Sequence, residues 1–188
     1  MMSKHVFLIG GILIAGVAAA VIAHVLLKKP PTAPLDLLGE RMYDPQLKLA
    51  YRPPAQWRIT QASPELAKRF ADDQRRLIAH FEGPNPGDQA DLIAFKSPDR
   101  LRQVREQVLA QQKKMEKRAI GDEFLILNTV PAWVYEYVAR QGTFASHTIC
   151  VVLDRGDRKV VLSCTGSPKS VAEQRRAILE SIKNIKLE

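Results

Sequence analysis

The sequence of 188 residues has few of the side chains that build metal and redox sites, with only two cysteines and four histidines. No histidine stands at metal-ligand spacing from another histidine or from a cysteine, so no zinc site is predicted. The nucleophile-elbow, phosphate-loop and dinucleotide-binding glycine patterns are also missing. We therefore predict no catalytic residue, no metal ligand and no cofactor, and we expect the chain not to be an enzyme.

Aromatic residues and excess charge are also scarce. Aromatic residues make up 6% of the chain and fall in strand patterns, without the interleaving with basic residues that is typical of RNA-binding sheets. From Pro30 onward there are 25 basic and 20 acidic residues, a small positive excess that the need for solubility can explain. We expect no nucleic-acid partner.

A long uncharged stretch stands near the N-terminus. Residues 6–27 (VFLIGGILIAGVAAAVIAHVLL) form a run of 22 residues without a charge. As a helix this run would be about 33 Å long, enough to cross a hydrocarbon core of about 30 Å. The favoured interpretation is a single transmembrane helix that acts as an uncleaved signal anchor. A cleaved signal peptide is the alternative, because small residues at 18–23 resemble cleavage sites.

The rest of the chain divides into a spacer and one domain. Three prolines at 30, 31 and 34 deny the spacer a helix. The predicted organisation is an N-terminal tail at 1–5, a transmembrane helix at 6–27, a Pro-rich linker at 28–43 and a globular domain at 44–188. We expect the protein in the cell membrane, with the domain exported to the periplasmic or extracytoplasmic side. A cytoplasmic orientation stays open, because basic residues flank both ends of the helix.

Three Ser-Pro pairs mark helix starts in the domain, because serine can cap free amides and proline suits the first helical position. The pairs stand at 63–64, 97–98 and 167–168. They predict helices over about 65–74, 98–120 and 169–187. In the second helix, Leu101, Val104, Val108 and Met115 share one apolar face, and Gly121 is expected to stop the helix.

Short apolar segments between these helices predict strands. They lie at 47–51, 57–59, 77–81, 91–95, 124–127, 133–138, 148–153 and 160–164. Several are joined by short turns, which predicts a largely antiparallel sheet of about seven strands. Helices stand before and after the strand runs and do not alternate with them, so the predicted fold class is α+β, with the sheet covered by helices.

The order of these elements resembles the PsbP-like family, whose fold is shared by an extrinsic photosystem II subunit and a small nuclear-transport factor that acts on Ran. The matching stretches are 51–57 (YRPPAQW), 135–137 (YEY), the hairpin around Gly156 and 178–182 (ILESI). The resemblance implies an αβα sandwich and a role in binding a partner, in a small bacterial member with a membrane anchor. No ion-binding or Ran-contacting residue of the relatives maps onto this chain.

The second predicted helix is strongly basic. An anionic membrane or polyanion could contact its cations, which are Arg102, Arg105, Lys113, Lys114, Lys117 and Arg118. The alternative is an ordinary solvated helix face. Glu136 stands between two tyrosines on a predicted strand, and we expect it to be an exposed strand residue.

The two cysteines flank one predicted hairpin. If the hairpin centres near Asp157, Cys150 and Cys164 lie directly opposite each other and could form a disulfide. A shift of one residue would place them on opposite faces of the sheet. In an exported domain both a disulfide and two packed thiols stay open, whereas a cytosolic domain favours two packed thiols.

The sequence thus favours a non-enzymatic, membrane-tethered module of the cell envelope that binds a protein partner or assists assembly. The first alternative is an anionic-lipid or polyanion binder that uses the basic helix at 98–120. The second alternative is an enzyme with an unrecognised site. The predicted partners are the membrane, through one N-terminal span, and a protein of unknown identity.

Overall fold

A computed structural model of the chain describes residues 37–72, 74–115 and 117–187. The predicted tail at 1–5, the predicted transmembrane helix at 6–27 and most of the linker lie outside these residues. Within the described part, no helix is long and apolar enough to cross a membrane. Leu37–Glu188 forms one compact unit, which contains all the helices and strands given below.

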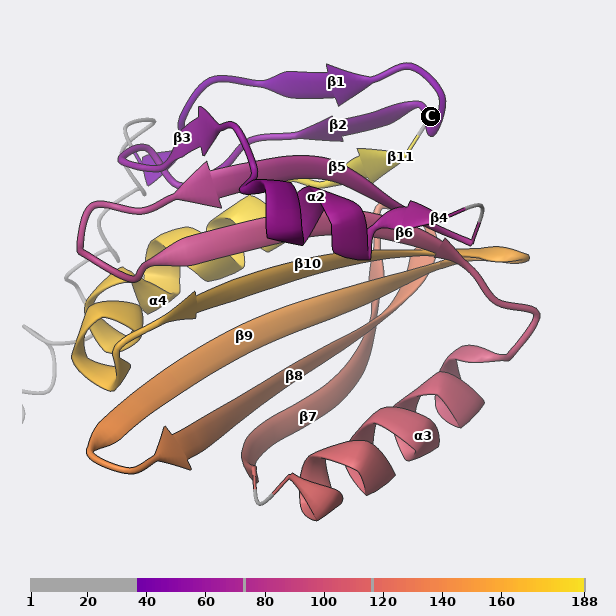
Figure 1. The fold of residues 1–188 in the computed structure, drawn as a ribbon. Helices are drawn as coiled ribbons and strands as arrows, with labels where there is room; N and C mark the ends of the chain where they lie inside the picture. The colour runs from indigo at the N-terminus through magenta and orange to yellow at the C-terminus, as the bar shows by residue number, and fades with distance from the viewer. Residues whose placement is uncertain (1–36, 73, 116, 188) are drawn as a thin grey trace, which may run out of the picture. The chain divides into compact units, whose positions relative to one another are not determined.

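A large antiparallel sheet forms the centre of this unit (Figure 1). Its strands run in the order β3 (Arg58–Thr60), β5 (Arg75–Glu82), β6 (Gln89–Lys96), β10 (Arg158–Gly166), β9 (Phe144–Arg155), β8 (Val130–Gln141) and β7 (Arg118–Leu127). The short β4 (Ala71–Asp72) pairs with β5 beside β3. The predicted α+β class and the antiparallel sheet are confirmed.

A second, small sheet joins the two ends of the unit. β1 (Met42–Asp44), β2 (Leu49–Tyr51) and β11 (Lys186–Leu187) lie in the order β1-β2-β11. Leu49 and Tyr51 of β2 are buried in the same core cluster as Ile178. The N-terminal part of the unit is thereby fixed to its last helix.

Of the three helices in the described ranges, two begin where the Ser-Pro pairs predict. The side chain of Ser63 caps α2 (Pro64–Arg69), and that of Ser167 caps α4 (Pro168–Lys183), each accepting a bond from a backbone N–H of the first turn. α3 (Leu101–Lys114) begins three residues after Pro98, with Arg100 at its N-cap. Leu66 and Phe70 are half-buried, and α2 has no buried residue.

The second predicted helix is too long by six residues at its C-terminal end. α3 ends at Lys114, and the chain from Arg118 onward pairs with β8 instead. The strand ladder supplies hydrogen bonds to this segment and overrides its helical propensity. Gly121 follows a register shift in that ladder and does not terminate a helix. Met115, predicted to face inward, is exposed.

The two longer helices cover opposite faces of the sheet. Along β9, Ile149 and Val151 point into the core beneath α4, whereas Cys150 and Val152 point toward α3. In Figure 1, α4 lies behind the sheet and α3 lies along β7 and β8. Both faces of the central strands are therefore buried, as in the αβα sandwich that the resemblance implies.

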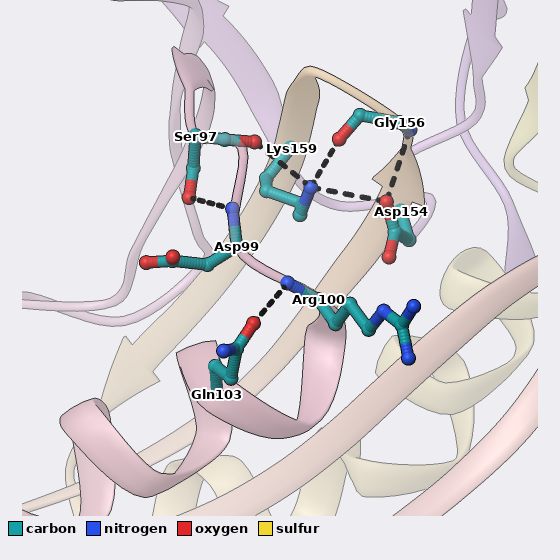
Figure 2. A network of polar contacts seen from close by, with 7 residues as sticks. All are labelled: Ser97, Asp99, Arg100, Gln103, Asp154, Gly156 and Lys159. Carbon is teal, nitrogen blue, oxygen red and sulfur yellow. Dashed lines mark hydrogen bonds and ion pairs between the residues drawn. The ribbon is translucent and has the colours of Figure 1, made fainter.

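A buried lysine connects two loops at one end of this sheet. Lys159, on β10, is fully buried. Its Nζ lies 3.1 Å from Asp154 Oδ1 and donates to the carbonyl oxygens of Ser97, at 3.1 Å, and Gly156 (Figure 2). An isolated buried ammonium would be costly, and these three oxygens replace its water.

The same network orders the entry into α3. Figure 2 shows Ser97 Oγ accepting a bond from the Asp99 N–H, at 3.2 Å, while the Arg100 N–H donates to Gln103 Oε1 at 2.8 Å. Lys159 holds the carbonyl of Ser97 at the start of this connection. It therefore ties the first turn of α3 to the hairpin of β9 and β10.

Replacing this lysine is expected to destabilise the fold. Lys159→Met leaves Asp154 and two carbonyl oxygens without their cation, and we expect a loss of about 2–4 kcal/mol in the free energy of unfolding. Urea denaturation followed by circular dichroism measures the loss. Lys113→Met, at an exposed lysine of α3, is the matched control and should change stability by less than about 0.5 kcal/mol. Equal effects of the two substitutions would contradict the assigned role of Lys159.

Candidate functional site

The six basic residues predicted to contact an anionic surface do not share one helix. Three of them, Arg102, Lys113 and Lys114, are exposed on α3. Lys117 follows the helix, and Arg118 is the first residue of β7. The prediction of a basic helix reaching to residue 120 is therefore wrong, because α3 ends at Lys114, before the last two cations, and Arg118 pairs with β8.

Arg105 is the sixth cation, and it is bound internally. Its Nε lies 2.8 Å from Asp122 Oδ2 and 3.1 Å from Oδ1, and Asp122 also accepts a bond from the indole N–H of Trp133. The hydrogen bond from Arg105 is the main cause that lowers the pKa of the Asp122 carboxyl. Arg105 thus fixes α3 to β7 and is less available to an external anion than the prediction assumed.

A row of aromatic rings lies between α3 and the sheet. Trp133 and Tyr135 on β8 stack with ring centroids 4.1 Å apart, and Tyr137 continues the row at 6.1 Å from Tyr135. The Phe124 ring of β7 lies beside Trp133 and extends the row. A cation stands over each end, with the Arg105 guanidinium 5.9 Å from the Phe124 ring and Lys117 Nζ 4.8 Å from the Tyr137 ring. These contacts hold α3 and its C-terminal loop on the sheet.

The two thiols lie on opposite faces of the sheet, and the predicted disulfide is not formed. Cys150 pairs with Ser163 across the hairpin, while Cys164 pairs with Ile149. The turn consists of Gly156 and Asp157, so the hairpin centres half a residue before Asp157 and the register shifts by one. Gly156 has a φ of +73°, which such a tight turn requires.

Both cysteines are packed thiols. Cys150 lies in the cluster beneath α3, and Cys164 in the core beneath α4. Burial raises the pKa of both thiols, although the hydroxyl of Ser163, 3.2 Å from Cys150 Sγ, acts in the opposite direction for Cys150. A protonated, buried thiol is a poor nucleophile, so neither cysteine suits a catalytic role.

Glu136 is buried, which corrects the prediction of an exposed strand residue. Its Oε1 accepts a hydrogen bond of 2.6 Å from Arg175 of α4, and His147 Nε2 of β9 lies 3.3 Å from Oε2. Sequence alternation correctly predicts that Glu136 points away from Tyr135 and Tyr137. The sequence also predicts the helix that becomes α4, but the strand pattern could not predict that its Arg175 packs against this carboxylate.

A second histidine–carboxylate pair lies on the other face of the sheet. His80 Nδ1 of β5 is 2.7 Å from Asp91 Oδ1 of β6, its neighbour in the ladder. His80 also lines a hollow of about 390 Å³, together with Glu82 and the turn residues 83–89. The lining is mostly polar backbone and turn side chains. Among the described residues, no three histidine, cysteine or carboxylate side chains could hold a metal ion.

Asp88, which the sequence analysis did not identify, binds this turn to α4. It is buried, and its Oδ2 accepts bonds from Ser170 Oγ at 2.6 Å, Gln174 Nε2 at 2.8 Å and Asn85 Nδ2 at 3.0 Å. Its Oδ1 has no hydrogen-bond partner in the described part of the chain and lies where a Cβ on Gly166 would stand. The carboxylate also lies near the N-terminus of α4, where the helix dipole favours a negative charge.

Comparisons with known proteins identify the fold. No protein-family model matches the sequence, and no curated protein matches it. The solution structure of cyanobacterial PsbP (CyanoP) from Synechocystis sp. PCC 6803 matches with a TM-score of 0.60 and 10% identity, over 86% of this chain and 99% of that one. LpqN of Mycobacterium tuberculosis, described as involved in cell envelope biogenesis, matches with a TM-score of 0.55 and 13% identity, over 79% and 89%. The fold is PsbP-like, and at these identities the likeness concerns the fold alone.

The state of the thiols can be tested chemically. We expect native protein, purified without reductant, to show almost no reaction with an aromatic disulfide reagent, because both thiols are buried and protonated. After denaturation, both Cys150 and Cys164 should react. Absorbance of the released thiolate measures both steps. Denatured protein that reacts only after treatment with a reductant would show that the cysteines are disulfide-bonded.

The contact between Asp88 and Gly166 can be tested with a double-mutant cycle. Asp88→Ala should lower the free energy of unfolding by about 1–3 kcal/mol, because it leaves buried donors without an acceptor. Gly166→Ala should also destabilise, because its new methyl group meets Asp88 Oδ1. In the Asp88→Ala background, the cost of Gly166→Ala should fall, since the obstructing oxygen is gone. Strictly additive effects in urea denaturation would contradict this contact.

Proposed function

We propose that this chain is a non-enzymatic binding or assembly module of the cell envelope. In this proposal residues 6–27 tether the chain to the membrane, the PsbP-like domain lies on the exported side, and the domain acts by binding another protein. The observation that carries the proposal is the outer edge of β7, which is long, exposed and partly apolar.

β7 is the last strand of the large sheet and pairs only with β8 among the described residues. It has ten residues, and the apolar run from Phe124 to Leu127 lies within it. Ile126 is 73% exposed and Phe124 is 44% exposed. An unpaired edge with exposed apolar side chains is a template for pairing with an extended segment of another protein.

The other edge of the sheet is less suited to this role. It is formed by β3, which has three residues, and by β4, which has two. Short edge strands discourage pairing with a further chain. A protein partner that adds a strand would therefore select β7.

The ionisable groups of the interior support a binding role over a catalytic one. Glu136 is held by Arg175, His80 by Asp91 and Lys159 by Asp154. Each pair connects two elements of the fold. A catalytic acid or base needs a proton-transfer partner on a substrate, and these groups are already engaged within the protein.

The structural neighbours are consistent with this proposal. One is a PsbP protein, and the other is described as involved in cell envelope biogenesis. The uncharged stretch at 6–27 would hold the domain at the envelope membrane. Tether, fold and open edge together suit a module that meets its partner at the membrane.

Site-specific photocrosslinking in living cells tests the proposal. A photoreactive amino acid at Phe124 in the full chain should give a discrete protein adduct on irradiation, because this side chain borders the open edge. The same amino acid at Ile59, a comparably exposed residue of β3, is the matched control and should give none. Adducts are detected as shifted bands and identified by mass spectrometry.

A blocking substitution makes the test specific. Ile126→Lys puts a charge on the edge, which disfavours strand addition. It should lower the yield of the Phe124 adduct at least tenfold. It should change stability by less than about 0.5 kcal/mol, because the side chain is exposed. Equal adduct yields from positions 124 and 59, or an adduct at 124 that persists with Ile126→Lys, would contradict the proposed binding at β7.

A further inference from the structure

Exposed apolar side chains and cations gather at one end of the domain, away from the open part of the β7 edge. The C-terminus of α3, the first residues of β7 and the turn between β8 and β9 form this end. Arg118 pairs with Val138, and three residues further along β8, Gln141 pairs with Phe144 at the turn. Figure 1 shows the same three segments at the lower left of the large sheet. We name this end the basic tip.

Three large apolar side chains project from the basic tip. Phe144 is 81% exposed, the most of any large hydrophobic residue in the described part of the chain. Met115 and Ile120 are each 56% exposed. They stand at a hairpin end, a helix end and the start of a strand, so they form projections and not a groove. Exposed apolar side chains that gather at one end of a domain mark a candidate interaction surface.

Four exposed cations surround these projections: Lys113, Lys114, Arg118 and Arg140. None of them has an ion pair with another described residue. The sequence at 113–120 contains a single acid, Glu116, and the sequence at 138–146 contains none. The basic tip therefore combines apolar projections with uncompensated positive charge.

The other two cations near this end differ from these four. The Lys117 ammonium stands over the ring of Tyr137, and Arg105 is bound to Asp122. Both hold α3 and its following loop on the sheet. They position the tip, whereas the four unpaired cations can reach an external anion.

We propose that the basic tip docks on the surface of a bilayer that contains anionic lipids. An aromatic ring and aliphatic side chains can enter the boundary between headgroups and acyl chains, while lysine and arginine contact the anionic headgroups. An extended protein segment would pair along the edge of β7, whereas Phe144 on β9 and Met115 at the end of α3 lie outside that strand. A nucleic acid would use the cations but would leave the apolar projections in water.

This inference goes beyond the proposed function, because it concerns a lipid surface and not a protein partner. A domain tethered near a bilayer needs only weak contacts to stay docked, since the tether supplies a high local concentration. Docking through the tip would leave the apolar part of the β7 edge open, because Ile126 lies near the turn that joins β7 to β8, at the far end of that strand. The two surfaces can therefore be occupied together.

The test places a reporter at the tip of the full chain. The full chain carrying Phe144→Trp is reconstituted in nanodiscs of phosphatidylcholine, with or without 30% phosphatidylglycerol. Some of the lipid acyl chains are brominated. Bromine quenches only a tryptophan that enters the acyl region. The native Trp57 and Trp133 are buried and supply a constant background. We expect at least twofold quenching of the added fluorescence and a blue shift in anionic discs, and neither effect in neutral discs.

Two variants control for position and charge. Ile59→Trp reports from β3, which lies four strand positions and about 19 Å across the sheet from β9, the strand of Phe144, and it should not be quenched in either lipid. Neutralising Lys113, Lys114, Arg118 and Arg140 to glutamine should abolish quenching of Trp at 144, since each cation contributes about fivefold to the docking equilibrium. Raising salt to 0.5 M should have the same effect on the original reporter.

The possible results separate this inference from the proposed function. No quenching at 144 in anionic discs, equal quenching at 59, or quenching that is unchanged by the glutamine substitutions would overturn docking by the tip. In the discs only the lipid carries bromine, and the scaffold that surrounds the bilayer is the same in neutral and anionic discs, so a difference in quenching reports contact with the anionic lipid surface. Loss of the photocrosslinks at Phe124 would reject the proposed function and leave the lipid contact intact.

Discussion

The antiparallel register between β9 and β10 is the constraint on which the rest of the structure depends. The central parts of both strands are covered on both faces, so the side chains along Ile149–Leu153 and Val160–Cys164 alternate between one core and the other. The two-residue turn at Gly156 and Asp157 sets this register. A shift by one residue would exchange the two faces, bring the thiols together and turn Lys159 toward the apolar core beneath α4.

Buried charge in this domain serves to join elements that are distant in sequence. Lys159 connects the hairpin to the entry of α3, Asp88 connects the β5–β6 turn to α4, and Glu136 connects β8 to α4. Each buried ionic group would be costly alone and is supported by hydrogen bonds from the element that it joins. These groups specify how the helices seat on the sheet. Because these groups are engaged within the fold, the proposed binding surfaces are built from exposed residues.

Two exposed features suit two different kinds of partner. The open edge of β7 offers backbone groups and apolar side chains to an extended protein segment. The basic tip offers projecting apolar side chains and unpaired cations to a lipid surface. The basic tip also depends on the end of α3 at Lys114, because this early end lets residues 118–120 begin β7 instead of continuing the helix.

The sequence by itself determined the features that depend on neighbouring residues. Serine and proline at 63–64 and 167–168 predict two helix starts, and alternation along the chain predicts the strands and the α+β class, because capping and side-chain periodicity act over a few residues. Tertiary structure decided the end of α3, the separation of Cys150 and Cys164, the burial of Glu136 and the roles of Lys159 and Asp88. Each of these depends on pairing or packing with a segment far away in the chain. A single-residue change of register or the approach of one helix reverses such a result, and no local pattern encodes it.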